Sequence, residues 1–271
     1  MDKEYDVLIV EDEPVVLAAI KKIVEPEKLV VDATDDVDSA LEKLSRNTYR
    51  LIISDLMLPK ISGYDFIRVI KEKYPRIPLI VITGYATLEN ALQSFKTGSF
   101  DFIPKPFDTE AFLGVVERGM NYGKKMHALG PHKQICFPLA LPHGMDQNLC
   151  GLHCLGHHAW VKPVEDGTAL IGAGDTFPEM IEDLDRIEFH LSNNEIIQGK
   201  RCAQLISKNG LVNMFWAPLS GNVIAVNHEL EGNVQLINTS PFDEGWFFRI
   251  IPVLPEEELK HLTCCEKKSD K

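Results

Sequence analysis

The chain has 271 residues, a hydrophobic content of 45% and a formal net charge of -12 at pH 7. This length predicts two domains of ordinary size. No apolar run is long enough for a membrane span and the charged start is not a signal peptide, so we expect a cytoplasmic protein. Residues 127–271 carry 11 basic and 19 acidic side chains. This balance argues against a DNA-binding effector, which would need a basic surface.

The first half of the chain alternates short apolar runs with segments of helical spacing. The segment 14–23 places its apolar residues on one face of a helix and begins with Pro14, which suits a first helical turn. The same spacing recurs in 37–44, 63–70, 88–95 and 111–116. Alternating strands and helices of this length predict βαβ units and a doubly wound parallel sheet.

Polar side chains follow four of the apolar runs. The runs are 7–10, 51–54, 79–82 and 101–104, and the side chains that end or follow them are Glu11 with Asp12, Asp55, Thr83 and Lys105. The carboxyl ends of parallel strands share one edge of a sheet, so these groups are expected to converge. A carboxylate can accept a phosphoryl group, and carboxylate oxygens hold Mg²⁺. A single acid after a strand is usually only solvated, but five groups in register predict an aspartyl phosphate site.

Four motifs around these residues resemble the receiver domains of two-component response regulators. They are Val10-Glu11-Asp12-Glu13, Ile53-Ser54-Asp55-Leu56-Met57-Leu58-Pro59, Ile82-Thr83-Gly84-Tyr85-Ala86 and Lys105-Pro106-Phe107. The resemblance covers about residues 4–122 and implies a five-stranded α/β domain. It implies that Asp55 is the phosphoacceptor. It also implies that Mg²⁺ is bound by Asp12 directly, by Glu11 largely through water, by Asp55 and by the backbone carbonyl of Met57.

The same resemblance implies how the phosphoryl group is sensed and which partners are involved. Thr83 and Lys105 would contact the phosphoryl group, and Phe102 would occupy the aromatic switch position. Phe102 lacks the hydroxyl that many relatives carry there, so a hydrogen-bonded switch at that ring is excluded. The implied partner is a bacterial sensor histidine kinase, and a homodimer through the receiver is a further expectation. The implied chemistry is limited to phosphorylation and dephosphorylation of the protein itself.

The second half of the chain has a different pattern, with short apolar runs between turn residues. Asn209-Gly210 is a strong hairpin signal between the runs 205–206 and 211–212. Such strands predict an all-β sandwich or flattened barrel of about a hundred residues. One helical segment is expected, at 177–184. The other apolar runs are 169–171, 196–197, 203–206, 223–226 and 246–250.

Several segments of this half resemble the H-protein of the glycine cleavage system over about residues 156–254. They include His158-Ala159-Trp160-Val161, Pro218-Leu219-Ser220-Gly221 and Gly245-Trp246-Phe247-Phe248. H-proteins carry lipoate on a lysine at a hairpin tip upstream of the Pro-x-Ser-Gly segment. Counting along the chain puts that position at Asn209 or Gly210, and Lys208 is the only nearby lysine. We therefore expect no lipoate, with Lys208 as the alternative attachment site.

A cysteine and histidine string precedes this region. Cys136, Cys150, Cys154 and His157 are spaced C-x13-C-x3-C-x2-H. Cytoplasmic cysteines are metal ligands or free thiols more often than disulfides, and zinc accepts this mixture. The spacing lacks the C-x2-C pair of a standard finger, so we interpret the segment as a linker with free thiols, with a zinc or redox site as the alternative. Two further residues are expected to be structural, namely His158 and Cys202.

These features divide the chain into a receiver domain at 1–123, a linker at 124–155, an H-protein-like domain at 156–262 and a polar tail at 263–271. The expected function is that of a response regulator, in which phosphorylation of Asp55 controls what the H-protein-like domain binds. The partner of that domain is not identified by the sequence. Two alternatives remain: a lipoyl carrier that uses Lys208, and a metal or redox sensor that uses Cys136, Cys150 and Cys154.

Overall fold

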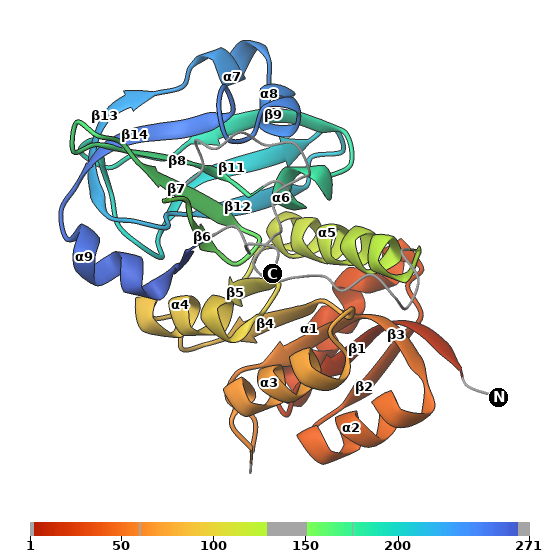
Figure 1. Cartoon of the computed structure of the whole chain (residues 1–271). Coiled ribbons are helices and arrows are strands. Elements are labelled where there is room, and N and C mark those ends of the chain that lie inside the picture. The colour runs from red at the N-terminus through yellow and green to blue at the C-terminus, as the bar shows by residue number, and fades with distance from the viewer. Residues whose placement is uncertain (1–2, 60, 129–150, 175, 265–271) are drawn as a thin grey trace, which may run out of the picture. The chain divides into compact units, whose positions relative to one another are not determined.

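The computed structural model describes residues 3–59, 61–128, 151–174 and 176–264. The chain divides into two compact units, Met1–His132 and Lys133–Lys271 (Figure 1). Each unit is described by itself below.

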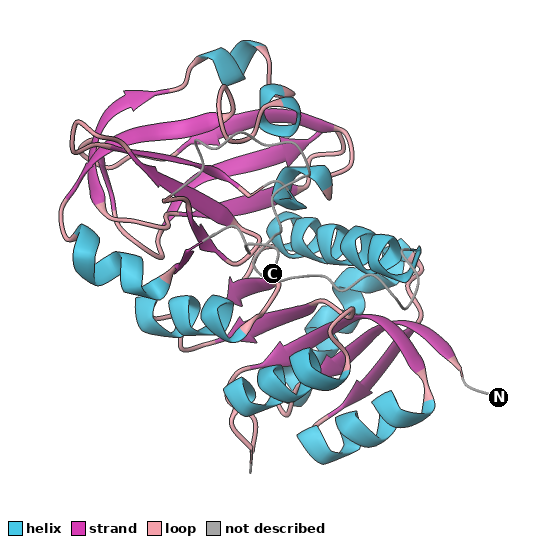
Figure 2. Cartoon of the chain, in the orientation of Figure 1, coloured by secondary structure: helices cyan, strands magenta, loops and turns pink. Residues whose placement is uncertain are grey.

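The first unit is a parallel sheet flanked by helices, as the alternating pattern predicts (Figure 2). Its strand order is β2-β1-β3-β4-β5, and each neighbouring pair is parallel. The elements are β1 Glu4–Val10, α1 Pro14–Val24, a 3₁₀ turn Glu25–Glu27, β2 Val31–Thr34, α2 Val37–Arg46, β3 Thr48–Asp55, α3 Gly63–Lys73, β4 Leu79–Thr83, α4 Leu88–Thr97, β5 Asp101–Pro104 and α5 Thr109–Ala128.

Local chemistry explains where these helices begin. Pro14 lies in the first turn of α1, where its missing N–H leaves no hydrogen bond unmade. The side chain of Asp36 accepts the N–H of Ser39 at the start of α2, and Thr87 accepts that of Asn90 at the start of α4. Each cap pairs a backbone donor that has no partner inside its helix. The helix starts are therefore set by single polar residues.

The core of the first unit lies on both faces of the sheet. Val7, Leu8, Ile9 and Val10 of β1 are all fully buried. A strand buried on both faces reads as a continuous apolar run, which is the pattern of a parallel sheet covered by helices. The sheet therefore presents its strand ends, and not its faces, to solvent.

Two glycines bring α5 against β3. A Cβ atom at Gly123 would lie 2.3 Å from the backbone oxygen of Arg50, and one at Gly119 would lie 2.9 Å from a methyl carbon of Leu51. At Gly123 the neighbour is backbone, so only glycine permits this approach of the helix to the sheet, whereas at Gly119 the Leu51 side chain would have to shift. The close packing explains why glycine, which is unfavourable inside a helix, occurs at these two positions of α5.

The second unit consists mainly of antiparallel strands in two sheets. One sheet has the order β10-β13-β14-β8-β7-β6-β15 and the other β12-β11-β9. The elements are β6 His153–Leu155, β7 Ala159–Pro163, β8 Ala169–Ala173, α6 Thr176–Glu179, β9 Leu184–Phe189, β10 Glu195–Ile196, β11 Arg201–Ser207, β12 Val212–Trp216, β13 Gly221–Val226, α7 Glu229–Gly232, α8 Leu236–Thr239, β14 Trp246–Pro252, α9 Pro255–Glu258, a 3₁₀ turn Leu259–His261 and β15 Thr263–Cys264.

An aromatic cluster forms the core of this unit. The ring of Phe215 packs edge-on against Phe247 with 4.8 Å between centroids, and His158 stacks on Phe215 at 5.1 Å. The Nε2 atom of His158 accepts the backbone N–H of Trp216 at 2.7 Å. The structural role expected for His158 is thereby confirmed, and Cys202 is buried as predicted.

The helix predicted in the second half is shorter than expected. The segment expected to be helical at 177–184 forms only the short helix α6, and Leu184 already begins β9. Asp183 adopts a left-handed backbone conformation, with a φ of 49°, which ends any helical path. The short helices α7, α8 and α9 were also not predicted, because four residues are too few to show helical periodicity.

Two strands at one end of the larger sheet lie outside the domain limits expected from the sequence. The strand β6 precedes residue 156, and β15 follows residue 262. These two strands pair with each other, with Thr263 opposite Cys154. Pairing between residues so far apart in the chain leaves no local signal, so the sequence pattern did not indicate it.

We predict that Gly123→Ala destabilises the protein by about 1–3 kcal/mol, because the added methyl group meets the backbone oxygen of Arg50, which belongs to a central strand and cannot move aside. The intrinsic helix preference of alanine recovers at most about 1 kcal/mol. Urea denaturation followed by circular dichroism measures the difference. Gly232→Ala is the control, since a Cβ there meets no atom within 4 Å, and an equal effect of both variants would contradict the close approach.

Candidate functional site

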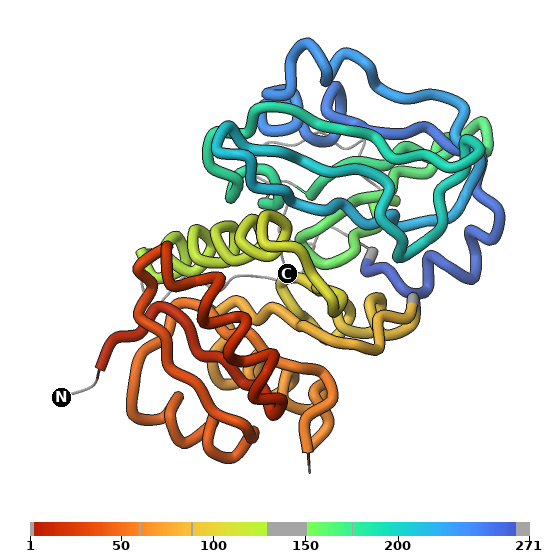
Figure 3. Tube along the Cα trace, turned by 180° about the vertical axis from the view of Figure 1, so that it is seen from behind, coloured from red at the N-terminus to blue at the C-terminus, as the bar shows by residue number. Residues whose placement is uncertain are grey.

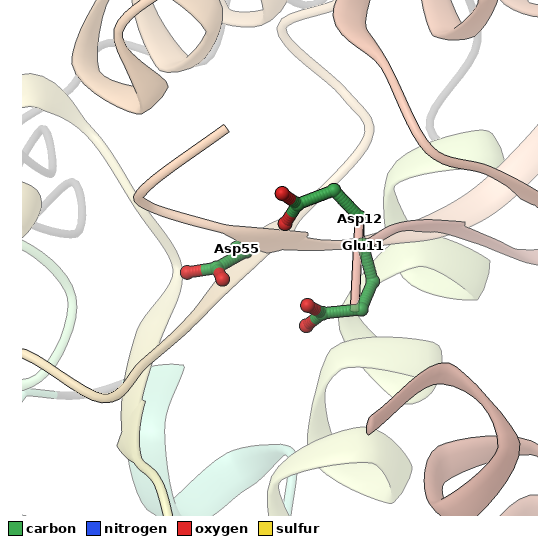
Figure 4. A group of neighbouring side chains, drawn as sticks. All are labelled: Glu11, Asp12 and Asp55. Carbon is green, nitrogen blue, oxygen red and sulfur yellow. The ribbon is translucent and has the colours of Figure 1, made fainter. Parts of the chain in front are cut away.

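Three carboxylates meet at the carboxyl edge of the parallel sheet. Glu11 and Asp12 follow β1, and Asp55 is the last residue of β3. One side-chain oxygen from each lies within 4.8 Å of the others (Figure 4). Glu11 and Asp55 are buried, whereas Asp12 is exposed. The convergence expected from the strand-end positions is therefore present, with one carboxylate open to solvent.

Lys105 supplies the positive charge of this site. Its Nζ atom lies 2.8 Å from Glu11 Oε2, 2.9 Å from Asp55 Oδ2 and 3.3 Å from Glu13 Oε1. The residue follows β5, and its backbone N–H donates to the carbonyl of Thr83 at 2.8 Å, which ties it to the end of β4. One ammonium group thus bridges carboxylates that come from β1 and β3.

Burial and charge act in opposite directions on these groups. Burial raises the pKa of Glu11, the nearby charge of Asp55 raises it further, and the Lys105 ammonium offsets only part of the effect. Burial by itself would lower the pKa of Lys105, but the hydrogen bonds to Glu11 and Asp55 outweigh it, so the pKa is raised. The lysine is therefore held in its charged form, while the glutamate is ionised at a cost.

The remaining residues expected at this site lie around the same edge. Thr83 ends β4 and is fully buried, and its Oγ1 atom accepts the N–H of Tyr85 at 3.1 Å. The backbone N–H of Met57 donates to Asp55 Oδ1 at 3.1 Å, and the Met57 side chain is exposed. Phe102 is buried in β5, opposite Val81 of β4. Thr83 and Met57 thus lie at a strand end or on the loop after one, whereas Phe102 lies within its strand.

The sequence interpretation gave no role to Glu13, which the structure places next to Lys105. Glu13 is an exposed acid that follows the Glu11-Asp12 pair, and its backbone N–H donates to Glu11 Oε1 at 3.2 Å. The only available signal was a third acid in the same motif. Its orientation depends on side-chain rotamers, which a motif does not specify.

These donors fit a hard divalent cation. Mg²⁺ prefers oxygen ligands, keeps several waters and is typically held by one or two carboxylates. Glu11, Asp12 and Asp55 offer such oxygens close together, and the exposure of Asp12 leaves room for water. Within the residues that the structure describes, this is the one group of acidic, histidine or cysteine side chains with spacing suited to a metal.

In the second unit, Lys208 lies at the tip of the β11–β12 hairpin. Its side chain is exposed, and its backbone N–H donates to the carbonyl of Asp183 at 3.0 Å. Asn209 and Gly210, the two positions that the H-protein pattern aligns with the lipoyl lysine, are exposed on the same tip. Gly210 has a φ of 87°, which a hairpin turn of this kind requires. Lys208 thus offers the only amine of this turn, next to the aligned positions.

The cysteine and histidine string is only partly described by the structure. Cys136 and Cys150 lie outside the described residues. Cys154 is buried in β6, where it pairs with Trp160 of β7, and His157 is buried shortly after it. The zinc or redox alternative therefore stays a prediction.

None of the helices in the described ranges is both long and apolar enough to cross a membrane.

Comparison with known families agrees with both domain interpretations. The model of the response regulator receiver domain matches residues 7–117, and the model of the glycine cleavage H-protein matches residues 152–271. The N-terminal half is therefore a response regulator receiver domain, and through its C-terminal half the chain belongs to the glycine cleavage H-protein family.

Curated relatives match one half or the other. The glycine cleavage system H protein of Shewanella halifaxensis is 37% identical over 95 residues, which are 35% of this chain and 73% of that protein. The DNA-binding transcriptional regulator NtrC of Proteus hauseri is 27% identical over 117 residues, which are 43% of this chain and 25% of that protein. The response regulator protein PilR of Pseudomonas aeruginosa is 37% identical over 101 residues, which are 37% of this chain and 23% of that protein. The chain spans about a quarter of the length of the regulators it matches.

Solved structures of receiver domains also match the first half. A CheY-like receiver domain protein from Methanospirillum hungatei has 27% identity and a TM-score of 0.42, and the match covers 46% of this chain and 98% of that one. The beryllofluoride-activated NtrC4 receiver domain dimer has 30% identity and a TM-score of 0.42, with coverage of 45% and 99%.

We predict that Glu11→Gln stabilises the protein at neutral pH when no divalent cation is added. The folded-state pKa of Glu11 lies above its unfolded value, so the ionised carboxylate opposes folding at neutral pH. As the pH falls through the raised pKa towards the ordinary glutamate value of 4.5, Glu11 takes up a proton in the folded state and the stability advantage of the variant should shrink. Thermal unfolding at a series of pH values measures this difference.

Asp65→Asn is the control for this experiment, because Asp65 is an exposed acid on α3 whose carboxylate pairs with Arg68 at the surface. A Glu11→Gln variant that is less stable than the wild type at neutral pH would show that the ion pair with Lys105 outweighs the burial of the carboxylate.

Proposed function

We propose that the protein is a response regulator of a two-component phosphorelay that accepts a phosphoryl group on Asp55 with Mg²⁺. The observation that carries this proposal is the position of Lys105, which lies 2.9 Å from Asp55 and belongs to the same edge as the three-carboxylate group. Phosphoryl transfer depends mainly on positioning and on neutralising the charge of the transferring oxygens. This edge supplies a carboxylate nucleophile together with a fixed cation.

The residues of the site divide the work of such a transfer. An Asp55 oxygen would form the bond to phosphorus as the bond between phosphorus and the donor breaks, with a phosphohistidine of a sensor kinase as the proposed donor. The Lys105 ammonium would neutralise charge on a phosphoryl oxygen, and the Thr83 hydroxyl would donate to another. Mg²⁺, held by Glu11, Asp12, Asp55 and the backbone carbonyl of Met57, would supply further positive charge.

We further propose that the H-protein-like domain is the output of the receiver and acts by binding another protein. Its scaffold is held by contacts that do not involve Lys208. A Cβ at Gly221 would lie 2.6 Å from the backbone oxygen of Ile251, and one at Gly245 would lie 2.7 Å from that of Leu236. Gln198 also donates to the carbonyl of Pro218 at 2.8 Å. These close contacts account for the Pro-Leu-Ser-Gly and Gly-Trp segments as packing requirements of the fold.

The charge of this domain disfavours nucleic acid as the output partner. Residues 156–262 carry 16 acidic and 7 basic side chains. A nucleic-acid-binding surface needs clustered positive charge to neutralise phosphates. A protein partner is therefore the proposed output.

The exposed position of Lys208 favours a second candidate function, that of a lipoyl carrier regulated by phosphorylation. A lysine at a hairpin tip is the arrangement in which H-proteins present their lipoyl group. The bound group would supply a thiol carrier, and Lys208 would contribute its amine as the attachment point. Against this candidate, Lys208 precedes the aligned positions Asn209 and Gly210, and the residue before it, Ser207, is buried and carries no charge.

We predict that acetyl phosphate with Mg²⁺ labels the wild-type protein and that Asp55→Asn reduces the label to background, because the carboxylate nucleophile is removed. Asp12→Ala should slow labelling and weaken Mg²⁺ binding by at least about tenfold. Loss of a residue that only orients a metal ligand already weakens metal binding by about that factor, and Asp12 is proposed to be a ligand itself. Intact-mass measurement over time follows the label.

Asp65→Asn is again the matched control and should be labelled like the wild type. Undiminished labelling of Asp55→Asn would place the phosphorylation site elsewhere and would contradict the proposed function.

We predict that a lipoate ligase leaves the full-length protein unmodified, because the lysine of the turn is displaced from the position that the H-protein pattern requires. Intact mass before and after incubation measures the result, and a bacterial H-protein serves as the positive control. Modification that is lost in Lys208→Ala and retained in Lys200→Ala, an exposed lysine before β11, would instead establish the carrier function.

A further inference from the structure

The loop 84–87, which follows Thr83, is held by hydrogen bonds at both of its ends. The backbone N–H of Tyr85 donates to Thr83 Oγ1 at 3.1 Å. The carbonyl of Tyr85 accepts the N–H of Thr87 at 2.8 Å and the side-chain amide of Asn90 at 2.7 Å. Tyr85 is 63% exposed, so burial of this residue does not hold the loop in place. Hydrogen bonds connect the loop to the β4 hydroxyl on one side and to the first turn of α4 on the other.

A tyrosine on a different helix fixes the orientation of Asn90. The hydroxyl of Tyr64, in the first turn of α3, donates to Asn90 Oδ1 at 3.0 Å. With its oxygen engaged in this way, the amide of Asn90 must direct its Nδ2 group towards the Tyr85 carbonyl. The backbone N–H of Asn90 is separately bonded to Thr87 Oγ1 at 3.1 Å. Tyr64 therefore sets the rotamer of the residue that holds the loop.

We propose that Tyr64 and Asn90 are positioning residues of the phosphorylation site. Together they form a latch, defined here as the hydrogen-bond chain from the Tyr64 hydroxyl through the Asn90 side chain to the Tyr85 carbonyl. The latch stabilises the loop in the arrangement in which Thr83 Oγ1 accepts the N–H of Tyr85, and it thereby sets how readily Thr83 turns towards a phosphoryl group. This inference rests on the proposed function, because it takes Asp55 as the residue that carries the phosphoryl group.

The latch acts through the position of the Thr83 Oγ1 atom, because a rotation of this side chain would carry the atom away from the N–H of Tyr85. In the present arrangement the buried Oγ1 atom accepts this N–H. If the Thr83 hydroxyl turns to donate to a phosphoryl oxygen, Tyr85 either loses this partner or moves with it. Movement of Tyr85 breaks the bond from Asn90, and this loss costs the modest net free energy of one exposed hydrogen bond. The bonds of the latch thus exist in one arrangement only and oppose the other.

Phe102, the aromatic residue of β5, cannot take over the role of the latch. Phe102 is buried and has no hydroxyl, so it cannot form a hydrogen bond to the loop in either arrangement. The hydroxyl of Tyr64, on α3, is connected to the loop through the side chain of Asn90. Residues of α3 and α4, through the latch, therefore set how readily the loop after Thr83 rearranges when a phosphoryl group is present.

Beryllofluoride, a mimic of the phosphoryl group, tests the latch in the full-length protein with Mg²⁺. Tyr64→Phe should bind the mimic about threefold to tenfold more tightly than the wild type, which is the range expected for one hydrogen bond of ordinary net strength. Asn90→Ala should have an effect in the same direction, and the double variant should bind no more tightly than Asn90→Ala, because both changes break one chain. Damage to the fold would weaken binding and so has the opposite sign.

Tyr74→Phe, at the other end of α3, is the matched control and should bind the mimic like the wild type. Affinity of Tyr64→Phe equal to or weaker than that of the wild type would overturn the latch. If the wild type does not bind the mimic at all, the proposed function fails, and the coupling of the latch to phosphorylation fails with it.

Amide hydrogen exchange of the protein without added mimic tests the hydrogen-bond chain independently of binding. Amides of residues 85–90 should exchange faster in Tyr64→Phe than in the wild type, because the loop has lost its hold. Unchanged exchange in this segment would overturn the latch whatever the outcome for the mimic.

Discussion

The ion pairs of Lys105 with Glu11 and Asp55 are the interaction on which the N-terminal site depends. Two buried carboxylates at the ends of β1 and β3 repel each other, and burial disfavours the charge of Glu11. The single ammonium lies within 2.9 Å of both and makes their ionised forms tolerable. With Asp12 included, three carboxylates meet beside this one ammonium, so the site keeps an excess of negative charge. That excess is what a divalent cation would neutralise.

The parallel sheet explains why these groups can be held so closely. Its strands are buried on both faces, so the backbone at their ends cannot shift without disturbing the core. The loops beyond the strand ends are less constrained, and the loop after Thr83 is held by a few hydrogen bonds. A rigid set of charges beside an adjustable loop is the arrangement that the proposed switch needs.

In the second unit, the residues that pack the core differ from the exposed residues of the β11–β12 turn. Its core of packed aromatic rings and its glycine contacts lie away from the residues of the β11–β12 turn. Lys208, Asn209 and Gly210 are all exposed there, so substitutions in the turn leave the packing unaffected. The residues on which the lipoyl-carrier candidate depends are therefore separate from those that hold the scaffold.

The sequence by itself determined which residues of the first unit meet, because parallel strands place their carboxyl ends on one edge and the motifs mark those ends. It also indicated the β11–β12 hairpin, since Asn209-Gly210 suits the backbone of a tight turn. Only the tertiary structure decided that Glu13 joins Lys105, that Tyr64 reaches Asn90 and that β6 pairs with β15. These contacts depend on side-chain rotamers and on pairing between distant segments. Local spacing carries no record of either, because both are chosen by the packing of the whole domain.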